Sequence, residues 1–164
     1  MTIILQLLGL ADLRTLAASR TPRHLTTSNT ASGALPPAFV AQRALALLEA
    51  GKSPAWCATF LMLRVSDQMV VGACGFKDEP QDGQVEIGYG VSPDWHGQGI
   101  ATDAVRELAR IAFASGAVER VLAKIAPDNI ASLRVVGKLG FEAGARVRDA
   151  EGEELVQWVL RKPV

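Results

Sequence analysis

The sequence contains few cysteine, histidine and aromatic residues and no excess charge, and each scarcity excludes a class of site. Its 164 residues include 17 basic and 17 acidic side chains, so the formal net charge is zero. No basic run and no patch of basic and aromatic residues is present, which argues against nucleic-acid binding. Cys57 and Cys74 do not form a Cys-x-x-Cys pair, and His24 and His96 lie far apart. We therefore predict neither a metal site nor a disulfide framework, and interpret both thiols as buried.

Long apolar runs are also missing. The opening segment MTIILQLLGL is apolar, but it has no basic leader and is too short to cross a bilayer. No other stretch approaches the length of a membrane helix. We therefore expect a soluble, cytoplasmic protein without a membrane partner, and interpret the opening segment as an edge strand.

The apolar content is sufficient for a folded core. Hydrophobic residues make up 49% of the chain, which argues against disorder, and the length is that of one domain, residues 1–164. Helical patterns or strand patterns, separated by turn residues, run along the whole chain. Helices are expected over 11–19, 38–50, 101–115 and 127–141, and strands over 1–10, 56–65, 69–77, 84–91, 120–126, 145–149 and 155–162. This order predicts an α/β or α+β fold, with a mixed sheet, a central antiparallel meander and a closing hairpin around Glu151 and Gly152.

Residues 21–37, TPRHLTTSNTASGALPP, have the composition of a loop. They contain no carboxylate and are rich in threonine, serine, alanine and proline. A connection of this length is unusual in a compact domain, where long loops are either mobile or contact a substrate. Both interpretations stay open.

The segment SPDWHGQGIATDAV, residues 92–105, joins a predicted strand to a predicted helix through a glycine-rich turn. The first N–H groups of a helix have no partner within the helix, and the helix dipole adds partial positive charge, so such a turn can bind phosphate oxygens. Gly97 and Gly99 have no Cβ to keep an anion from the main chain. A tight turn with close helix packing is the structural alternative. A third glycine and a P-loop lysine are both missing, so neither NAD nor a nucleoside triphosphate is expected.

A second motif lies in PDNIASLRVVGKLGF, residues 127–141. Together with the glycine turn, it resembles the GNAT N-acetyltransferases, and in particular their RimJ/RimL-like branch, which acetylates protein N-termini and small amines. The resemblance covers residues 60 to 160 and implies a mostly antiparallel mixed sheet whose fourth and fifth strands splay apart. It also implies an acyl-CoA-binding core over residues 57–164 and a variable acceptor-side region over residues 1–56. The residues that match the second motif are Asn129, Ser132, Lys138, Leu139, Gly140 and Phe141.

The resemblance implies acetyl-CoA as the co-substrate and no metal cofactor. The pyrophosphate is expected on the main-chain N–H groups of the glycine turn, where His96 replaces the usual arginine or glutamine. The pantetheine arm is expected along the backbone of residues 89–91. The implied cofactor-binding residues are Tyr89, Gly90, Val91, His96, Gly97, Gln98, Gly99, Ile100, Ala101, Thr102 and Asn129.

Acetyl transfer also requires a neutral amine, and the departing thiolate requires a proton donor or a hydrogen bond. A lysine amine, with a pKa near 10.4, needs a base more than an α-amine with a pKa near 8 does. Glu86 stands where histone-acetylating relatives carry a glutamate, so it is the candidate base, with a structural glutamate as the alternative. Val136 occupies the position at which many relatives place a tyrosine acid. Ser132 is then the nearest candidate for supporting the thiolate, and a helix-packing hydroxyl is the alternative.

The resemblance therefore predicts an N-acetyltransferase that moves an acetyl group from acetyl-CoA to a primary amine by direct attack in a ternary complex. The acceptor is a protein N-terminus or a small-molecule amine, and the acyl-chain preference is open. A non-catalytic acyl-CoA-binding sensor or scaffold is the alternative, because of Val136 and His96. The family also suggests a homodimer, and the even charge argues against an acidic polymer as the acceptor.

Overall fold

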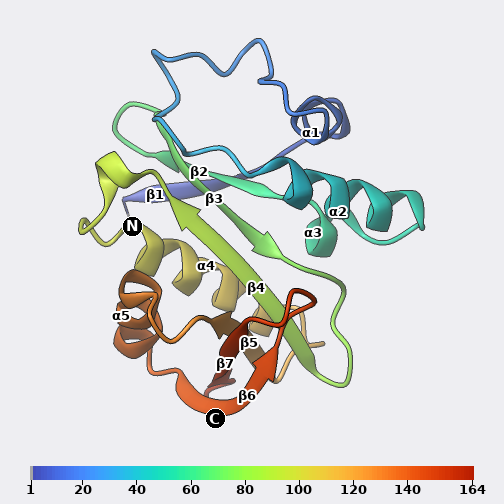
Figure 1. Cartoon of the computed structure of the whole chain (residues 1–164), viewed down its shortest axis with the longest axis vertical. Helices are drawn as coiled ribbons and strands as arrows, with labels where there is room; N and C mark the ends of the chain where they lie inside the picture. The colour runs from blue at the N-terminus through green and yellow to red at the C-terminus, as the bar shows by residue number, and fades with distance from the viewer. Residues whose placement is uncertain (1) are drawn as a thin grey trace.

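A seven-stranded sheet forms the centre of the molecule (Figure 1). The computed structural model describes residues 2–164, and the strand order is β1-β2-β3-β4-β5-β7-β6. The only parallel neighbours in this order are β4 and β5. The predicted mixed, mostly antiparallel sheet is thereby confirmed. The strands are β1 (Ile3–Leu7), β2 (Phe60–Arg64), β3 (Val70–Phe76), β4 (Gln84–Val91), β5 (Arg120–Ile125), β6 (Glu142–Arg148) and β7 (Glu154–Arg161).

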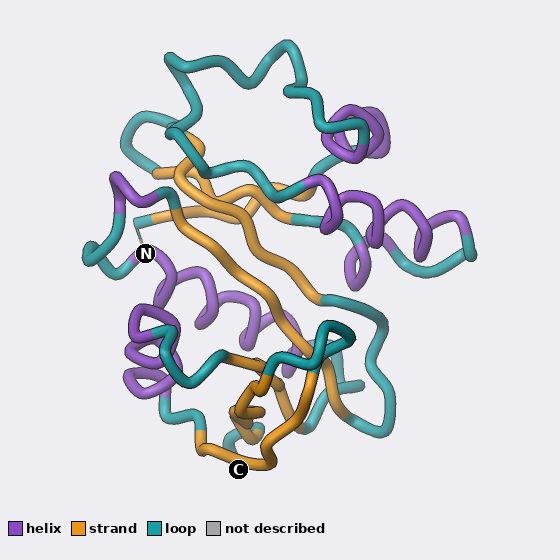
Figure 2. The backbone as a smooth tube through the Cα atoms, in the orientation of Figure 1, coloured by secondary structure: helices purple, strands orange, loops and turns teal. Residues whose placement is uncertain are grey.

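Helices cover both faces of the sheet (Figure 2). Two apolar cores join these helices to it. One core joins α1 and α2 to residues of β2 and β3 such as Leu61 and Ala73. The other joins α4 and α5 to residues of β3, β4 and β5 such as Phe76 and Val121. Among residues 2–164, none of the helices combines the length and the apolar character that a bilayer crossing requires. The helical elements are α1 (Leu10–Ala17), α2 (Ala38–Glu49), α3 (Pro54–Cys57), the 3-10 turn η1 (Pro93–Trp95), α4 (Ile100–Ala114) and α5 (Ile130–Leu139).

α4 follows the sequence pattern closely. The apolar positions that recur at spacings of three and four point into the core, and Val105 and Leu108 are completely buried. Full burial of one such side chain contributes about 1.5–3 kcal/mol, so this stripe fixes the helix against the sheet. Gly99 precedes the first residue of the helix, and Gly116 follows close after its last residue.

Two sequence predictions about boundaries are wrong. Trp56 does not open the second strand, because residues 54–57 form α3, with Pro54 at the first helical position. The Trp56 ring packs on Phe76 with their centroids 4.7 Å apart, and the strand begins only at Phe60. The sixth strand begins at Glu142 rather than at residue 145, across an irregularity in its pairing with β7.

The predicted splay between the fourth and fifth strands is confirmed. β4 and β5 pair at only three positions, from Gln84 with Arg120 to Glu86 with Leu122. β4 then continues to Val91 and β5 to Ile125 without further pairing between them in the described chain. A gap therefore opens toward the carboxyl ends of the two strands, where α4 and α5 follow.

The loop over residues 21–37 is anchored to the sheet. Ala31 N–H donates to the Val70 carbonyl at 2.8 Å, and Val70 N–H donates to the Asn29 carbonyl at 2.8 Å. The completely buried hydroxyl of Ser92 donates to the Ser32 carbonyl. These bonds argue against the interpretation of the loop as a mobile connector.

Gly72 on β3 provides a test of the packing between β3 and β4. A Cβ at Gly72 would lie 2.5 Å from the Gly90 carbonyl oxygen and 2.8 Å from the Met62 sulfur. Gly72→Ala is therefore expected to lower the free energy of unfolding by about 1–3 kcal/mol, the usual cost of overpacking. Urea unfolding followed by circular dichroism measures the loss.

Gly137→Ala is the matched control, since a Cβ at this helical position of α5 meets no atom within 4 Å. Because alanine favours helix over glycine, the control is expected to raise stability by up to about 1 kcal/mol. Equal stability changes in the two variants would contradict the assigned packing of Gly72.

Candidate functional site

The turn before α4 exposes a run of unpaired main-chain donors. In the described residues 2–164, the N–H groups of residues 97–102 make no hydrogen bond. Gly97 and Gly99 have φ values of 75° and 77°, a left-handed conformation that other residues seldom adopt. Residues 96–99 are exposed, whereas Ile100 and Thr102 are buried and hold the first turn of the helix in place. The predicted glycine turn therefore has the geometry of an anion site.

Three side chains fix this turn in place. His96 Nε2 lies 2.8 Å from the Val91 carbonyl oxygen, to which it donates, and so connects the turn to the end of β4. The Arg64 guanidinium lies over the Trp95 ring, 4.2 Å from its centroid. Trp95 thus anchors the turn, which agrees with the structural role that its position suggests.

Two predicted site residues meet across the gap between β4 and β5. The Tyr89 hydroxyl on β4 donates a long hydrogen bond, 3.4 Å, to the Ser132 carbonyl on α5. Burial raises the pKa of Tyr89, and the contact with Ser132 offsets only part of that effect. Asn129 caps α5, since its Oδ1 accepts from the Ser132 N–H at 3.2 Å. Val136, at the position where relatives carry a tyrosine, is completely buried.

Glu86 lies between two lysines on neighbouring strands. Its carboxylate contacts Lys77 Nζ at 2.5 Å and Lys124 Nζ at 3.0 Å. Burial acts to raise the pKa of Glu86, but the hydrogen bonds and charges of the two lysines outweigh it and hold this pKa below its ordinary value. A carboxylate with a lowered pKa is a weaker base, and both oxygens are engaged. This arrangement favours the structural interpretation of Glu86, and its role as a base stays a prediction.

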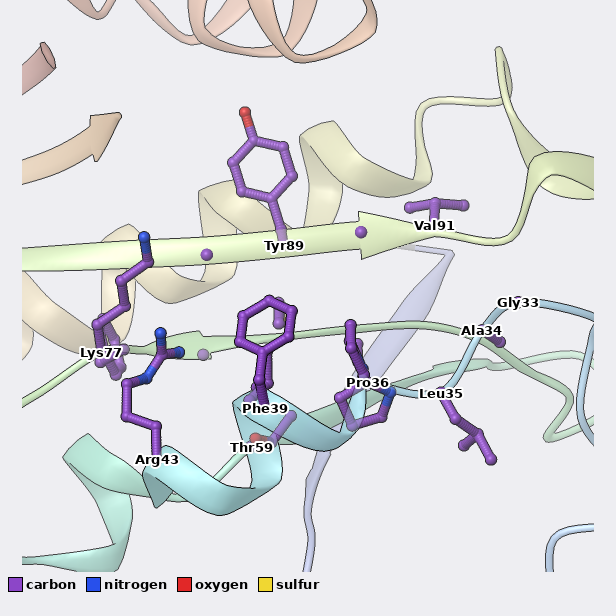
Figure 3. A pocket seen from close by; sticks show the side chains of 18 of the residues that line it. Gly33, Ala34, Leu35, Pro36, Phe39, Arg43, Thr59, Lys77, Tyr89 and Val91 are labelled. Carbon is purple, nitrogen blue, oxygen red and sulfur yellow. The ribbon is translucent and has the colours of Figure 1, made fainter. Parts of the chain in front are cut away.

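A cavity of about 420 Å³ lies on the face of β4 opposite α4 (Figure 3). It is an open cavity bordered by residues 33–37, the beginning of α2, and β3 and β4, where Gly88 and Gly90 form part of its wall. The end of the 21–37 loop therefore lines a pocket, as the substrate-contacting interpretation requires. Trp56 does not line it, although the neighbouring Cys57 does.

The anion turn, the gap and the cavity meet at the carboxyl-terminal half of β4. A ligand with phosphates on the turn can extend along residues 89–91 and present its far end beside the cavity. Two ligands would then meet there, which is the arrangement of a group-transfer site. In residues 2–164, no cluster of histidine, cysteine and acidic side chains is suited to a metal ion.

Comparison with protein families agrees with this class of site. A family model described as an acetyltransferase (GNAT) domain matches residues 2–142. Because the match covers most of the chain, the protein belongs to the GNAT acetyltransferase family. The resemblance drawn from the two sequence motifs is confirmed.

Curated relatives carry related names. The chain is 33% identical over 92 residues to the uncharacterized N-acetyltransferase p20 of Bacillus licheniformis, covering 56% of this chain and 51% of that protein. It is 27% identical over 84 residues to the uncharacterized N-acetyltransferase YjdG of Bacillus subtilis (strain 168), covering 51% and 50%. The chain spans about half the length of the curated relatives it matches.

Solved structures share the fold at low identity. The ribosomal-protein-S5-alanine acetyltransferase of Vibrio fischeri is 20% identical, with a TM-score of 0.69 over 99% of this chain and 97% of that one. RimL, a ribosomal L7/L12 α-N-protein acetyltransferase in complex with coenzyme A, is 17% identical, with a TM-score of 0.69 over 98% and 94%. An aminoglycoside acetyltransferase, AAC(6')-Ib, in complex with coenzyme A is 19% identical, with a TM-score of 0.69 over 98% of this chain and 95% of that one.

Sequence reasoning missed the lysines beside Glu86 and the cationic side of the cavity. Lys77 stands next to Glu86 only because of the register between β3 and β4, and Lys124 only because β5 pairs with the beginning of β4. The alternation of β4 indicated the face on which Glu86 lies, but not what meets it there. Arg43, on the exposed side of α2, carried no signal in the sequence.

The ion cluster makes the stability of the protein depend on pH. Because the folded-state pKa of Glu86 lies below its ordinary value of 4.5, the carboxylate stabilises the fold above that pH. This contribution is lost as the pH falls through the folded-state pKa. Glu86→Gln is expected to cost roughly 1–3 kcal/mol of unfolding free energy near neutral pH, and the difference from wild type is expected to shrink near pH 3.5.

Denaturant unfolding at the two pH values measures this difference. Glu49→Gln is the control, since Glu49 makes no ion pair among the described residues. A constant difference between wild type and Glu86→Gln at both pH values would contradict the proposed stabilisation by charge.

Proposed function

We propose that the protein is an N-acetyltransferase that moves an acetyl group from acetyl-CoA to a primary amine by direct attack in a ternary complex. The observation that carries the proposal is the run of unpaired N–H groups over residues 97–102, beside the gap between β4 and β5. Membership in the GNAT family supports acetyl-CoA as the ligand of this turn. The CoA complexes of related folds support it further.

Each part of the cofactor has an assigned place in this proposal. The main-chain N–H groups of Gln98, Gly99 and Ala101 hold the pyrophosphate. The backbone of residues 89–91 pairs with the pantetheine arm, and Asn129 contacts that arm from the opposite side of the gap. In this proposal residues 57–164 form the acyl-CoA-binding core, and residues 1–56 form the acceptor side.

The reaction needs few catalytic groups. The neutral amine nitrogen attacks the thioester carbonyl carbon and forms the C–N bond, the C–S bond breaks, and the proton that the nitrogen loses is balanced by the proton that the departing thiolate takes up. An α-amine has a pKa near 8, about one unit above neutral pH, so an appreciable fraction of it is already neutral. Such an amine depends little on a catalytic base. Ser132 supports the thiolate, and Tyr89 brings a phenol hydroxyl to the same turn of α5. Most of the rate acceleration then comes from holding two reactants together.

The alternative function is acyl-CoA binding without turnover, and it is favoured by two observations. Val136 removes the tyrosine acid of other relatives, and Glu86 is occupied by lysines. Measured acetylation of any amine would exclude this alternative. A cytoplasmic location, a homodimer and the lack of nucleic-acid or membrane partners stay predictions.

The first test is the thermal unfolding shift with acetyl-CoA, CoA, ATP and NAD in parallel. A ligand at a hundred times its Kd adds about 2.7 kcal/mol of stability, so binding is easily detected. We expect a rise with acetyl-CoA and CoA alone. No shift with either ligand would overturn the proposal.

Gly99→Asp tests the turn itself. Aspartate tolerates the left-handed backbone better than most residues, but its charge opposes a pyrophosphate, so CoA affinity is expected to fall by at least about tenfold. Gly116→Asp is the matched control, because Gly116 has the same φ of 77° at the other end of α4. Isothermal titration with CoA compares the two. Unchanged affinity in Gly99→Asp would remove the turn from the binding site.

The catalytic roles are tested by activity. If Glu86 is structural, kcat/KM of Glu86→Gln keeps the wild-type pH profile between about pH 6 and 9, whereas loss of a base changes that profile. Ser132→Ala and Tyr89→Phe are expected to lower kcat by about tenfold if their hydroxyls support the thiolate. Full activity of either variant excludes that hydroxyl from the mechanism.

A further inference from the structure

The cavity beside β4 is lined by apolar groups, the hydroxyl residues Thr59 and Tyr89 and two cations, with no carboxylate among its lining residues. Its charged side chains are Arg43 on α2 and Lys77 at the end of β3. Figure 3 places both at the same end of the cavity, with their charged ends directed toward β4. An amine substrate that carried only positive charge would meet repulsion there.

An ion pair partly neutralises the charge of Lys77, whereas the charge of Arg43 has no such partner in the described chain. The Lys77 stem passes over Gly88, where an added Cβ would lie 3.3 Å from Lys77 Cε, and its ammonium pairs with Glu86. Lys124 shares the same carboxylate, so two lysines surround one glutamate. Within residues 2–164, Arg43 makes neither a hydrogen bond nor an ion pair. Arg43 therefore has its guanidinium free for an anion.

Much of the remaining wall of the cavity is apolar. Leu35, Pro36, Phe39 and Val40 line it. Phe39 is 65% exposed, so an apolar ligand group that packs on its ring would remove apolar surface from water. The cavity volume of about 420 Å³ lies within the range of small-molecule sites.

We propose that the acceptor is a small primary amine that carries a carboxylate and an apolar side chain, as a free hydrophobic α-amino acid does. The carboxylate pairs with Arg43, the side chain packs on Phe39 and its apolar neighbours, and the amine faces Gly88 and Gly90, where the thioester arrives. This inference rests on the proposed function and specifies its acceptor. Polycationic amines such as aminoglycosides are excluded as good substrates by the same charges.

Matched acceptors test the charge requirement. Acetylation of L-phenylalanine, L-phenylalaninamide and spermidine is measured by thiol release at constant acetyl-CoA. We expect kcat/KM for L-phenylalanine to exceed that for the amide by about tenfold, because a carboxylate–guanidinium pair is a strong charge-assisted interaction. The amine of the amide is less basic, so a larger fraction of it is neutral and ready to attack. A preference for the acid would therefore show that the site recognises the carboxylate. Equal or better turnover of the amide or of spermidine would overturn the inference.

Arg43→Gln tests whether Arg43 is the side chain that binds the carboxylate. We expect it to lower kcat/KM for L-phenylalanine by about tenfold, mostly through KM, and to leave the amide nearly unchanged. Arg14→Gln is the control, since Arg14 is exposed on α1 and does not line the cavity. Equal losses on both substrates would mean that Arg43 supports the fold rather than the carboxylate.

Failure of this inference is distinguishable from failure of the proposed function. Calorimetric binding of L-phenylalanine and its amide in the presence of CoA needs no turnover. If CoA raises the unfolding temperature but L-phenylalanine does not bind, the acceptor inference fails and the acetyl-CoA proposal stands. No CoA shift overturns the acetyl-CoA proposal, and the acid-over-amide binding preference then still decides whether the cavity recognises carboxylates.

Discussion

The site depends on a sheet whose hydrogen bonding stops partway along one strand pair. β4 and β5 pair at three positions and then separate, so β4 presents an unpaired edge near the middle of the sheet. Buried backbone groups require partners, and an extended ligand with amide groups can supply them. Since the two strands are parallel, their carboxyl ends lie at the same edge, and both α4 and α5 begin there. The break thus places an unpaired strand and two helix N-termini around one space.

Much of the fold could be predicted because its signals are local. The apolar stripe of α4, the glycines at its ends and the alternation along β4 each depend on residues near one another in sequence. The start of the second strand could not be predicted in this way. The apolar run from Trp56 favours a strand locally, but Pro54 begins a helical turn and Trp56 packs on Phe76. Tertiary packing overrides propensity at that point.

The anion turn could be predicted from local sequence, whereas the surroundings of Glu86 and the cavity could not. The anion turn is made of main chain, and its glycine spacing is visible in the sequence. The environment of Glu86 depends on strand register, and the cavity depends on how α2 and residues 33–37 lie over β3 and β4. Neither the lysine partners nor Arg43 carries a local signal. The parts built from side chains on distant segments therefore required the structure.

The buried Ser92 connects the two halves mechanically. Its hydroxyl holds the Ser32 carbonyl, and a Cβ on Gly33 would lie 3.3 Å from Pro93, so the rim of the cavity rests on the segment that leads into the anion turn. The rim of the cavity and the segment that leads into the turn are thereby held together as one unit. Any effect of a ligand on the turn upon the affinity for a ligand in the cavity would be reciprocal, because linkage requires the same factor in both directions.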